Sequence, residues 1–241
     1  MYALLILTAV LYGAVAGALV PRARYRLAVE AGQEWRSVGP CGHPVAGWAG
    51  AARCGVCGER YAAGGLWSVA VTAAVCGGIA MAVGVRPELG VWLLMAPVAV
   101  VLAAVDWAVW RLPDVLTLPL AAGAVALLGV AALIPGAAGS WRRALLGALA
   151  LGAGYLGLFL LHPRGLGFGD VKLAVGLGCA LGWYGWGVLI LGALAGLLLG
   201  SGYGIGMLMT RRAGRGDAMP LGPFMIAGAW AGVLAGGWAA G

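Results

Sequence analysis

Long apolar stretches dominate the chain and are separated by short polar segments. A helix needs about 20 apolar residues to cross the hydrocarbon core of a bilayer. On this measure the sequence predicts eight spans, of which the third and sixth are short: residues 2–20, 66–85, 90–106, 115–134, 141–161, 170–182, 184–209 and 219–240. We therefore expect an all-α polytopic membrane protein with a first transmembrane helix (1–20), a loop subdomain (21–65) and a transmembrane core (66–241).

The least regular of these stretches is the run of residues 171–209, which is too long for a single helix. Its interior carries Gly182-Trp-Tyr-Gly185-Trp186, and glycine at such a point favours a turn. Tryptophan and tyrosine are also typical of a membrane interface. We expect two helices here, joined by a turn on the outer side of the membrane.

The charge distribution predicts the orientation. Only 10% of the 241 residues are charged and 63% are hydrophobic, which excludes an ordinary soluble domain. If the N-terminus lies outside, three cationic residues fall outside (Arg86, Arg142 and Arg143) and twelve inside. The inner set is Arg22, Arg24, Arg26, Arg36, Arg53, Arg60, Arg111, Arg164, Lys172, Arg211, Arg212 and Arg215. Cytoplasmic loops carry this excess, so an outside N-terminus is predicted, with the first span retained as an anchor.

The same bias accounts for the net charge of +7 without nucleic acid as a partner. Arginines near the inner leaflet are expected to meet anionic lipid headgroups. The oligomeric state is left open by the sequence.

The loop subdomain contains a candidate metal site. Cys54 and Cys57 have the two-residue spacing of a zinc knuckle, and Cys41 with His43 could complete four ligands. A segment this small usually needs a metal or other support. The alternative is a set of free thiols, since a disulfide is not expected on the reducing side of the membrane.

Two aspartates are the candidate catalytic residues. Asp106 ends the third predicted span and Asp170 opens the sixth, so both are expected at the same depth at the inner face. Acids are costly in a membrane and mark functional sites. Two carboxyl groups that share one proton can activate water and polarise a carbonyl, as in aspartic proteolysis. Either acid taken alone would be read as an interfacial residue or a helix cap.

The residues around the acids have predicted roles in positioning a substrate. Pro113 disfavours helix at the residue before it and can end a span, while Gly167 and Gly169 free the backbone and let a peptide approach. Lys172 is expected to reach the inner surface. Asp114 is expected either to cap the fourth helix or to assist the site.

Two further patterns concern packing and the outer loops. Gly192, Gly196 and Gly200 repeat at four-residue spacing, which predicts a close-packing helix face. Glu88 is expected to lie in an outer loop, between the second and third spans.

With these motifs identified, the chain resembles the type IV prepilin peptidases, which are bacterial membrane aspartyl proteases. The resemblance is carried by Asp106 with Leu112-Pro113-Asp114, by Gly167-Phe-Gly169-Asp170-Val-Lys172, and by Pro220-Leu-Gly-Pro-Phe224. It implies an endopeptidase of the inner membrane that removes the short basic leader of prepilins or pseudopilins at the cytoplasmic face, with Asp106 and Asp170 as the catalytic pair and no cofactor for proteolysis. In these substrates a hydrophobic helix follows the leader.

The loop departs from the family pattern. Members usually have two Cys-x-x-Cys pairs there, and many methylate the new N-terminus with S-adenosylmethionine. Here the second pair is Cys54 and Cys57, while the first is reduced to Cys41, with His43 and Pro44 in place of its partner. Methylation and S-adenosylmethionine binding are therefore left open.

Two other functions fit part of the pattern. A proton-coupled transporter would also use paired intramembrane acids, but internal symmetry would be expected and no repeat is evident. A catalytically silent protein of the pilus assembly machinery would tolerate loss of both aspartates.

Overall fold

The computed structural model describes residues 1–30, 32–62, 65–163, 165–211 and 219–241. Within these residues the chain forms eight α-helices and no β-strand, which confirms the all-α fold class. The helices are α1 (Tyr2–Leu27), α2 (Gly65–Val83), α3 (Glu88–Val109), α4 (Asp114–Ala131), α5 (Trp141–Leu161), α6 (Phe168–Tyr184), α7 (Trp186–Met209) and α8 (Gly222–Ala239). Each predicted span corresponds to one of them.

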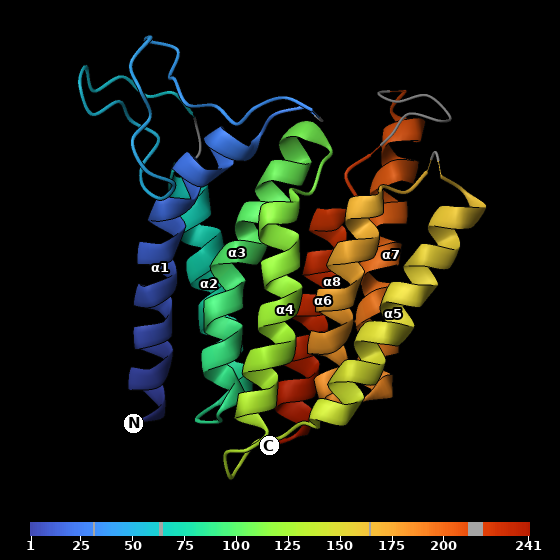
Figure 1. Cartoon of the computed structure of the whole chain (residues 1–241). Coiled ribbons are helices and arrows are strands. Elements are labelled where there is room, and N and C mark those ends of the chain that lie inside the picture. Colours follow the sequence, from blue (N-terminus) through green and yellow to red (C-terminus); the bar gives the residue numbers. More distant parts are fainter. Residues whose placement is uncertain (31, 63–64, 164, 212–218) are drawn as a thin grey trace.

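The helices form one bundle with α1 at one edge and α5 at the other (Figure 1). Six of them, α1 to α5 and α7, are long and apolar enough to cross a membrane. The closest neighbours are the pairs α1 and α2, α5 and α6, and α7 and α8. The loop subdomain lies over α1 and α2 at one end of the bundle, which we call the loop end, and both termini lie at the other, the far end (Figure 1).

Basic residues separate between these two ends. The described members of the predicted inner set lie in segments at the loop end, whereas Arg86, Arg142 and Arg143 lie in segments at the far end. The inner set also includes Arg164, Arg212 and Arg215, which fall outside the described residues.

The first helix continues past the predicted end of its span at Val20 and runs to Leu27. Its added turns carry arginines that bind the loop subdomain. Arg22 Nη1 donates to the carbonyl of Ala46 at 2.8 Å, and Arg26 Nη1 donates to that of Gly47 at 2.8 Å. The helix therefore supplies hydrogen bonds that a segment with so small a core cannot supply itself.

The third helix is longer than predicted, because it begins at Glu88 and extends to Val109 over 22 residues. Glu88 is fully buried, so its placement in an outer loop was wrong. Its Oε1 accepts the backbone N–H of Ala138 at 3.3 Å, which ties α3 to the connection between α4 and α5. An acid in the first turn of a helix is favoured by the helix dipole, which a measure of apolar length does not detect.

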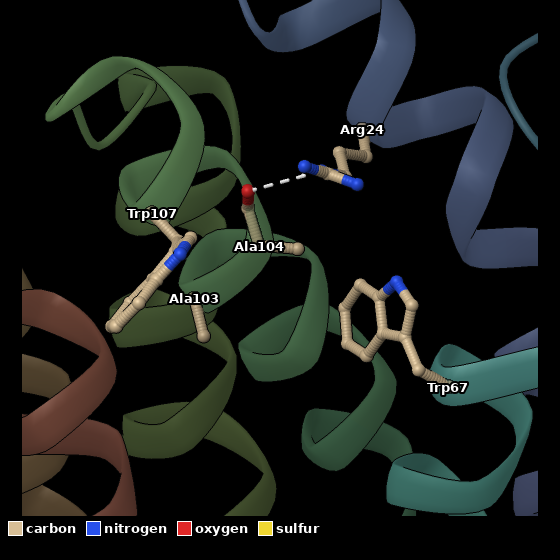
Figure 2. A pocket seen from close by; sticks show the side chains of 5 residues that line it. All are labelled: Arg24, Trp67, Ala103, Ala104 and Trp107. Carbon is tan, nitrogen blue, oxygen red and sulfur yellow. Dashed lines mark hydrogen bonds between the residues drawn. The ribbon is translucent and has the colours of Figure 1, made fainter. Parts of the chain in front are cut away.

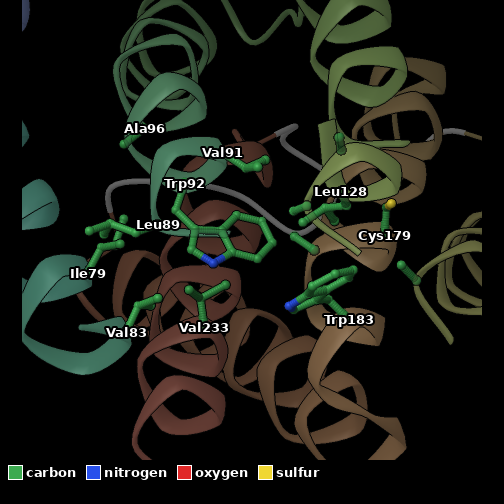
Figure 3. Close-up of a cluster of buried hydrophobic side chains, with 14 of the residues drawn as sticks. Ile79, Val83, Leu89, Val91, Trp92, Ala96, Leu128, Cys179, Trp183 and Val233 are labelled. Atoms are coloured by element: carbon green, nitrogen blue, oxygen red, sulfur yellow. The ribbon is translucent and has the colours of Figure 1, made fainter. Parts of the chain in front are cut away.

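The break between α6 and α7 lies where the sequence predicts it. Gly185 separates the two helices with φ of +127°, a conformation that favours glycine. Trp186 is half exposed, as expected near an interface, but Trp183 is fully buried. Figure 3 shows Trp183 in a core cluster that also contains Trp92, Leu128 and Cys179, so for Trp183 the interfacial interpretation was wrong.

Glycines on α7 form the predicted close-packing face against α8. Gly192, Gly196 and Gly200 are all buried. A Cβ atom on Gly196 would lie 3.0 Å from the carbonyl oxygen of Phe224. This approach brings the start of α8 into the centre of the bundle, beside the candidate site.

Candidate functional site

Two buried carboxyl groups lie at the loop end of the bundle. Asp106 is in the last turn of α3 and is 4% exposed, while Asp170 is in the first turn of α6 and is 8% exposed. They are close enough to interact electrostatically. The structure therefore brings together two acids that are 64 positions apart in the sequence.

Each carboxylate accepts a hydrogen bond from a glycine backbone N–H. Gly222, the first residue of α8, donates to Asp106 Oδ2 at 3.0 Å. Gly167, the N-cap of α6, donates to Asp170 Oδ2 at 3.0 Å. One oxygen of each acid is thus held in place by the backbone, which limits rotation of the carboxyl group.

Leu112, in the connection between α3 and α4, packs between the start of α6, which carries Asp170, and the start of α8, whose Gly222 holds Asp106. It is 6% exposed. A Cβ atom on Gly169 would lie 3.0 Å from Leu112 Cβ, and one on Gly222 would lie 3.3 Å from Leu112 Cδ2. The side chain therefore sets the spacing between the segment that carries Asp170 and the segment that holds Asp106.

Neither Gly167 nor Gly169 has a backbone conformation that requires glycine. Gly167 has φ of −79° and ψ of 146°, which any residue can adopt, and Gly169 lies within α6. A Cβ atom on Gly169 would be tighter against Leu112 than ordinary van der Waals contact, so a larger side chain would push Leu112 aside. Neither glycine therefore uses the backbone freedom that was expected of it, while the close approach of a peptide stays a prediction.

Pro113 and Asp114 start the fourth helix. Pro113 is the N-cap of α4, and Asp114 is its first residue rather than its cap. The Asp114 carboxylate forms an ion pair with Lys172 of α6, with Oδ2 2.7 Å from Nζ. Lys172 also lies over the ring of Phe168 at 5.0 Å. The pair joins α4 to α6 next to Asp170.

Three residues of the site were missed by reasoning from the sequence: Leu112, Tyr155 and Gly222. Tyr155 of α5 is 4% exposed and interacts electrostatically with Asp170. The signal available for Gly222 was its place in Pro220-Leu-Gly-Pro-Phe224, where a span begins with two prolines and a glycine. Tyr155 lies in an apolar stretch with no distinguishing neighbours.

The loop subdomain contains the second site. Cys41, His43, Cys54 and Cys57 place their ligand atoms within 4.8 Å of one another. Turns that follow Cys41 and Cys57 bring them together, and the glycine after each has positive φ, +77° at Gly42 and +74° at Gly58. Although the first cysteine pair of the family pattern is incomplete in this chain, His43 brings the cluster to four ligands.

The donor chemistry fits zinc. Three thiols and one imidazole form one of the common structural zinc sets. The buried Nδ1 of His43 has no hydrogen-bond partner within the described part of the chain. Backbone N–H groups of Cys57 and Val56, followed by the neighbouring thiols, lower the pKa of Cys54 to about 6. A thiolate at neutral pH is the form that binds a metal.

Comparison with known proteins gives one consistent result. The model of the type IV leader peptidase family matches residues 93–205. A prepilin leader peptidase/N-methyltransferase of Pseudomonas aeruginosa is 32% identical over 215 residues, or 80% of this chain and 69% of that protein. One of Burkholderia pseudomallei is 31% identical over 228 residues, or 86% and 67%. One of Aeromonas hydrophila is 33% identical over 166 residues, or 65% and 53%.

The alignments cover about half the length of the Aeromonas relatives. No solved structure matches the chain significantly.

Proposed function

The chain belongs to the type IV leader peptidase family, and we propose that it is an endopeptidase that cuts the short basic leader from prepilins or pseudopilins. The observation that carries the proposal is the meeting of two buried carboxyl groups, Asp106 and Asp170, at one end of an otherwise apolar bundle. Both residues stand in the motifs that the family resemblance identifies.

In the proposed mechanism the two carboxyl groups share one proton. The ionised member takes a proton from water as the water attacks the scissile carbonyl, and the protonated member donates a hydrogen bond to the carbonyl oxygen. The backbone N–H groups of Gly167 and Gly222 hold one oxygen of each acid, so the pair needs little rearrangement before reaction.

Gly167, Gly169, Pro113, Asp114 and Lys172 are proposed to position the substrate indirectly. These residues fix the positions of α4, α6 and the α3–α4 connection relative to Asp106 and Asp170. Gly169 admits the packing of a side chain from the α3–α4 connection, Pro113 begins α4, and the ion pair of Asp114 with Lys172 joins α4 to α6. Movement of any of these would shift the carboxyl groups relative to a bound peptide.

The loop cluster is proposed to hold a structural zinc ion, with Cys41, His43, Cys54 and Cys57 as ligands. Bound there, zinc would cross-link two parts of a subdomain whose own apolar core is small. Proteolysis by the aspartate pair needs no cofactor. Methylation with S-adenosylmethionine stays outside the proposal, because the first cysteine pair of the family pattern is incomplete here.

We place the protein in the bacterial inner membrane, with the N-terminus outside and the site at the cytoplasmic face. The support is the separation of basic residues between the two ends of the bundle, since cytoplasmic segments carry the excess of Lys and Arg. The partners would be prepilin or pseudopilin substrates and the surrounding lipids.

The direct test replaces each acid in turn. Asp106→Asn and Asp170→Asn keep the size of the side chain, so the protein should insert and unfold like the wild type while cleavage of a prepilin in vesicles is lost. Cleavage retained by either variant would overturn the assignment of the pair.

A further inference from the structure

An apolar cleft runs along α3 between α2 and α8. Its inner part has a volume of about 430 Å³ and is lined mainly by α2, α3 and α8, for example by Val71, Ala99 and Trp230, and in part by α4 and α6. A second cavity of about 370 Å³ continues toward the loop end, and Trp67 and Ala103 line both cavities. Figure 2 shows these two side chains with Arg24 and Trp107, which line the second cavity with them. The two cavities therefore form one cleft.

The cleft is closed toward the far end. There α2 and α8 touch, since a Cβ atom on Gly237 would lie 3.0 Å from the carbonyl oxygen of Ala82. Seven residues, or about two helical turns, nearer the loop end, Trp230 Nε1 of α8 donates to the carbonyl of Val75 of α2 at 3.4 Å. The cleft extends to both sides of this bridge: Ile79 and Val233 line it on the far-end side, while Trp67 and Pro223 line it on the loop-end side, where it continues into the second cavity.

The open end leads to the candidate catalytic pair. Ala99 lies seven residues before Asp106, which is close to two helical turns, so both stand on the same face of α3, about 10 Å apart along its axis. Ala103 lies between them on that face. Pro223 lines the cleft directly after Gly222, whose N–H binds Asp106.

We propose that this cleft binds the apolar membrane helix of the substrate. The inference rests on the proposed function, because a leader that precedes an apolar helix must reach Asp106 while that helix stays in the bilayer. From Trp92 to Trp107 the cleft follows α3 for 15 residues, about 22 Å, which matches most of one membrane helix. The small side chains of Ala96, Ala99 and Ala103 let another helix approach closely.

A second groove provides the matched control. It has a volume of about 340 Å³, is also apolar, and lies between α1, α3 and α4, where Ala16 lines it. Its residues on α3 include Pro97, which is nine residues before Asp106 and thus on the opposite side of the helix. A helix bound in this groove would not point its end at the acids.

The test places a photo-crosslinking amino acid, p-benzoylphenylalanine, at Ala99 or at Ala16 in the Asp170→Asn protein. The probe is a synthetic peptide with a basic leader and a 20-residue apolar helix, in vesicles of phosphatidylethanolamine and phosphatidylglycerol. The result expected is at least tenfold more cross-linked peptide from position 99 than from position 16, with the link mapped to the apolar helix. Preferential cross-linking at position 16, or cross-links from position 99 to lipid or to a second copy of the chain alone, would overturn the proposal.

A kinetic measurement separates this inference from the proposed function. Ala99→Trp should raise KM for the helix-bearing peptide about tenfold, because it removes binding without touching the chemistry. KM for a soluble peptide that ends shortly after the junction should rise much less, and Ala16→Trp, in the control groove, should affect neither substrate. If the wild type cuts neither peptide, the proposed function fails, and the cross-linking result still decides whether the cleft binds the helix.

Discussion

The substitution Gly222→Ala tests whether the backbone of α8 orients the catalytic pair. A Cβ atom at this position would lie 2.8 Å from Asp106 Oδ2 and 3.3 Å from Leu112 Cδ2. The first distance is too short for any real contact, so an atom must move. Asp106 is 4% exposed, and its carboxyl group is the end of a short side chain. We therefore expect the carboxyl group to rotate away and lose the hydrogen bond from the Gly222 N–H.

The size of the effect follows from that hydrogen bond. A hydrogen bond to a charged group contributes about 1.5–3 kcal/mol. If this hydrogen bond stabilises the reactive geometry of the pair in the transition state, its loss should lower kcat by about 10- to 150-fold. Each 1.4 kcal/mol corresponds to a factor of ten. KM should change little, because Gly222 is expected to act on the chemistry rather than on binding.

The assay compares kcat and KM for a prepilin in vesicles, together with thermal unfolding of the same preparations. Gly123→Ala in α4 is the matched control, because a Cβ atom there would meet nothing within 4 Å. The control should have wild-type activity. Gly222→Ala protein with wild-type kcat would refute the view that this amide positions Asp106.

Three further predictions concern the ion pair next to Asp170, the packing of α7 on α8, and the loop cluster. Lys172→Met should lower the free energy of unfolding by less than about 1 kcal/mol, because the ion pair with Asp114 is partly exposed; a double-mutant cycle in chemical denaturation measures it, and a coupling energy well above this would contradict the estimate. Gly228→Ala should destabilise by about 1–3 kcal/mol, since its Cβ atom would lie 2.7 Å from Gly196 Cα on α7; an unchanged melting temperature would show that the two helices are not packed so closely. His43→Ala should reduce the zinc content measured by mass spectrometry of purified protein from one equivalent toward zero, and wild-type protein without zinc would exclude the metal site.

The helix positions could be predicted because they depend on local composition. Each of the eight spans corresponds to a helix, and the glycine spacing on α7 identified a packing face correctly. The predictions that failed concern residues whose surroundings are formed by neighbours distant in the sequence. Glu88 was placed in a loop because an acid interrupts an apolar run, yet it is buried where it can accept the N–H of Ala138.

The two acids of the candidate site could be predicted from the sequence, but the residues that hold them in place could not. Asp106 and Asp170 stand out because a carboxyl group in an apolar stretch is costly. Gly222 and Leu112 carry no such signal, since their parts arise from contacts made only after α3, α6 and α8 pack together. The glycines before Asp170 were recognised as important, but the observed contacts differ from the expected backbone freedom: Gly169 packs against Leu112, and Gly167 donates its N–H to Asp170.

Intact-mass analysis of a prepilin incubated with the purified protein in vesicles, with labelled S-adenosylmethionine present, tests the central claim most directly. With the wild-type protein we predict two products whose masses sum to that of the substrate plus one water. With Asp106→Asn or Asp170→Asn we predict intact substrate. Any label on the mature product would report methylation separately. An uncut substrate with the wild-type protein, or the same two products with either variant, would contradict the account.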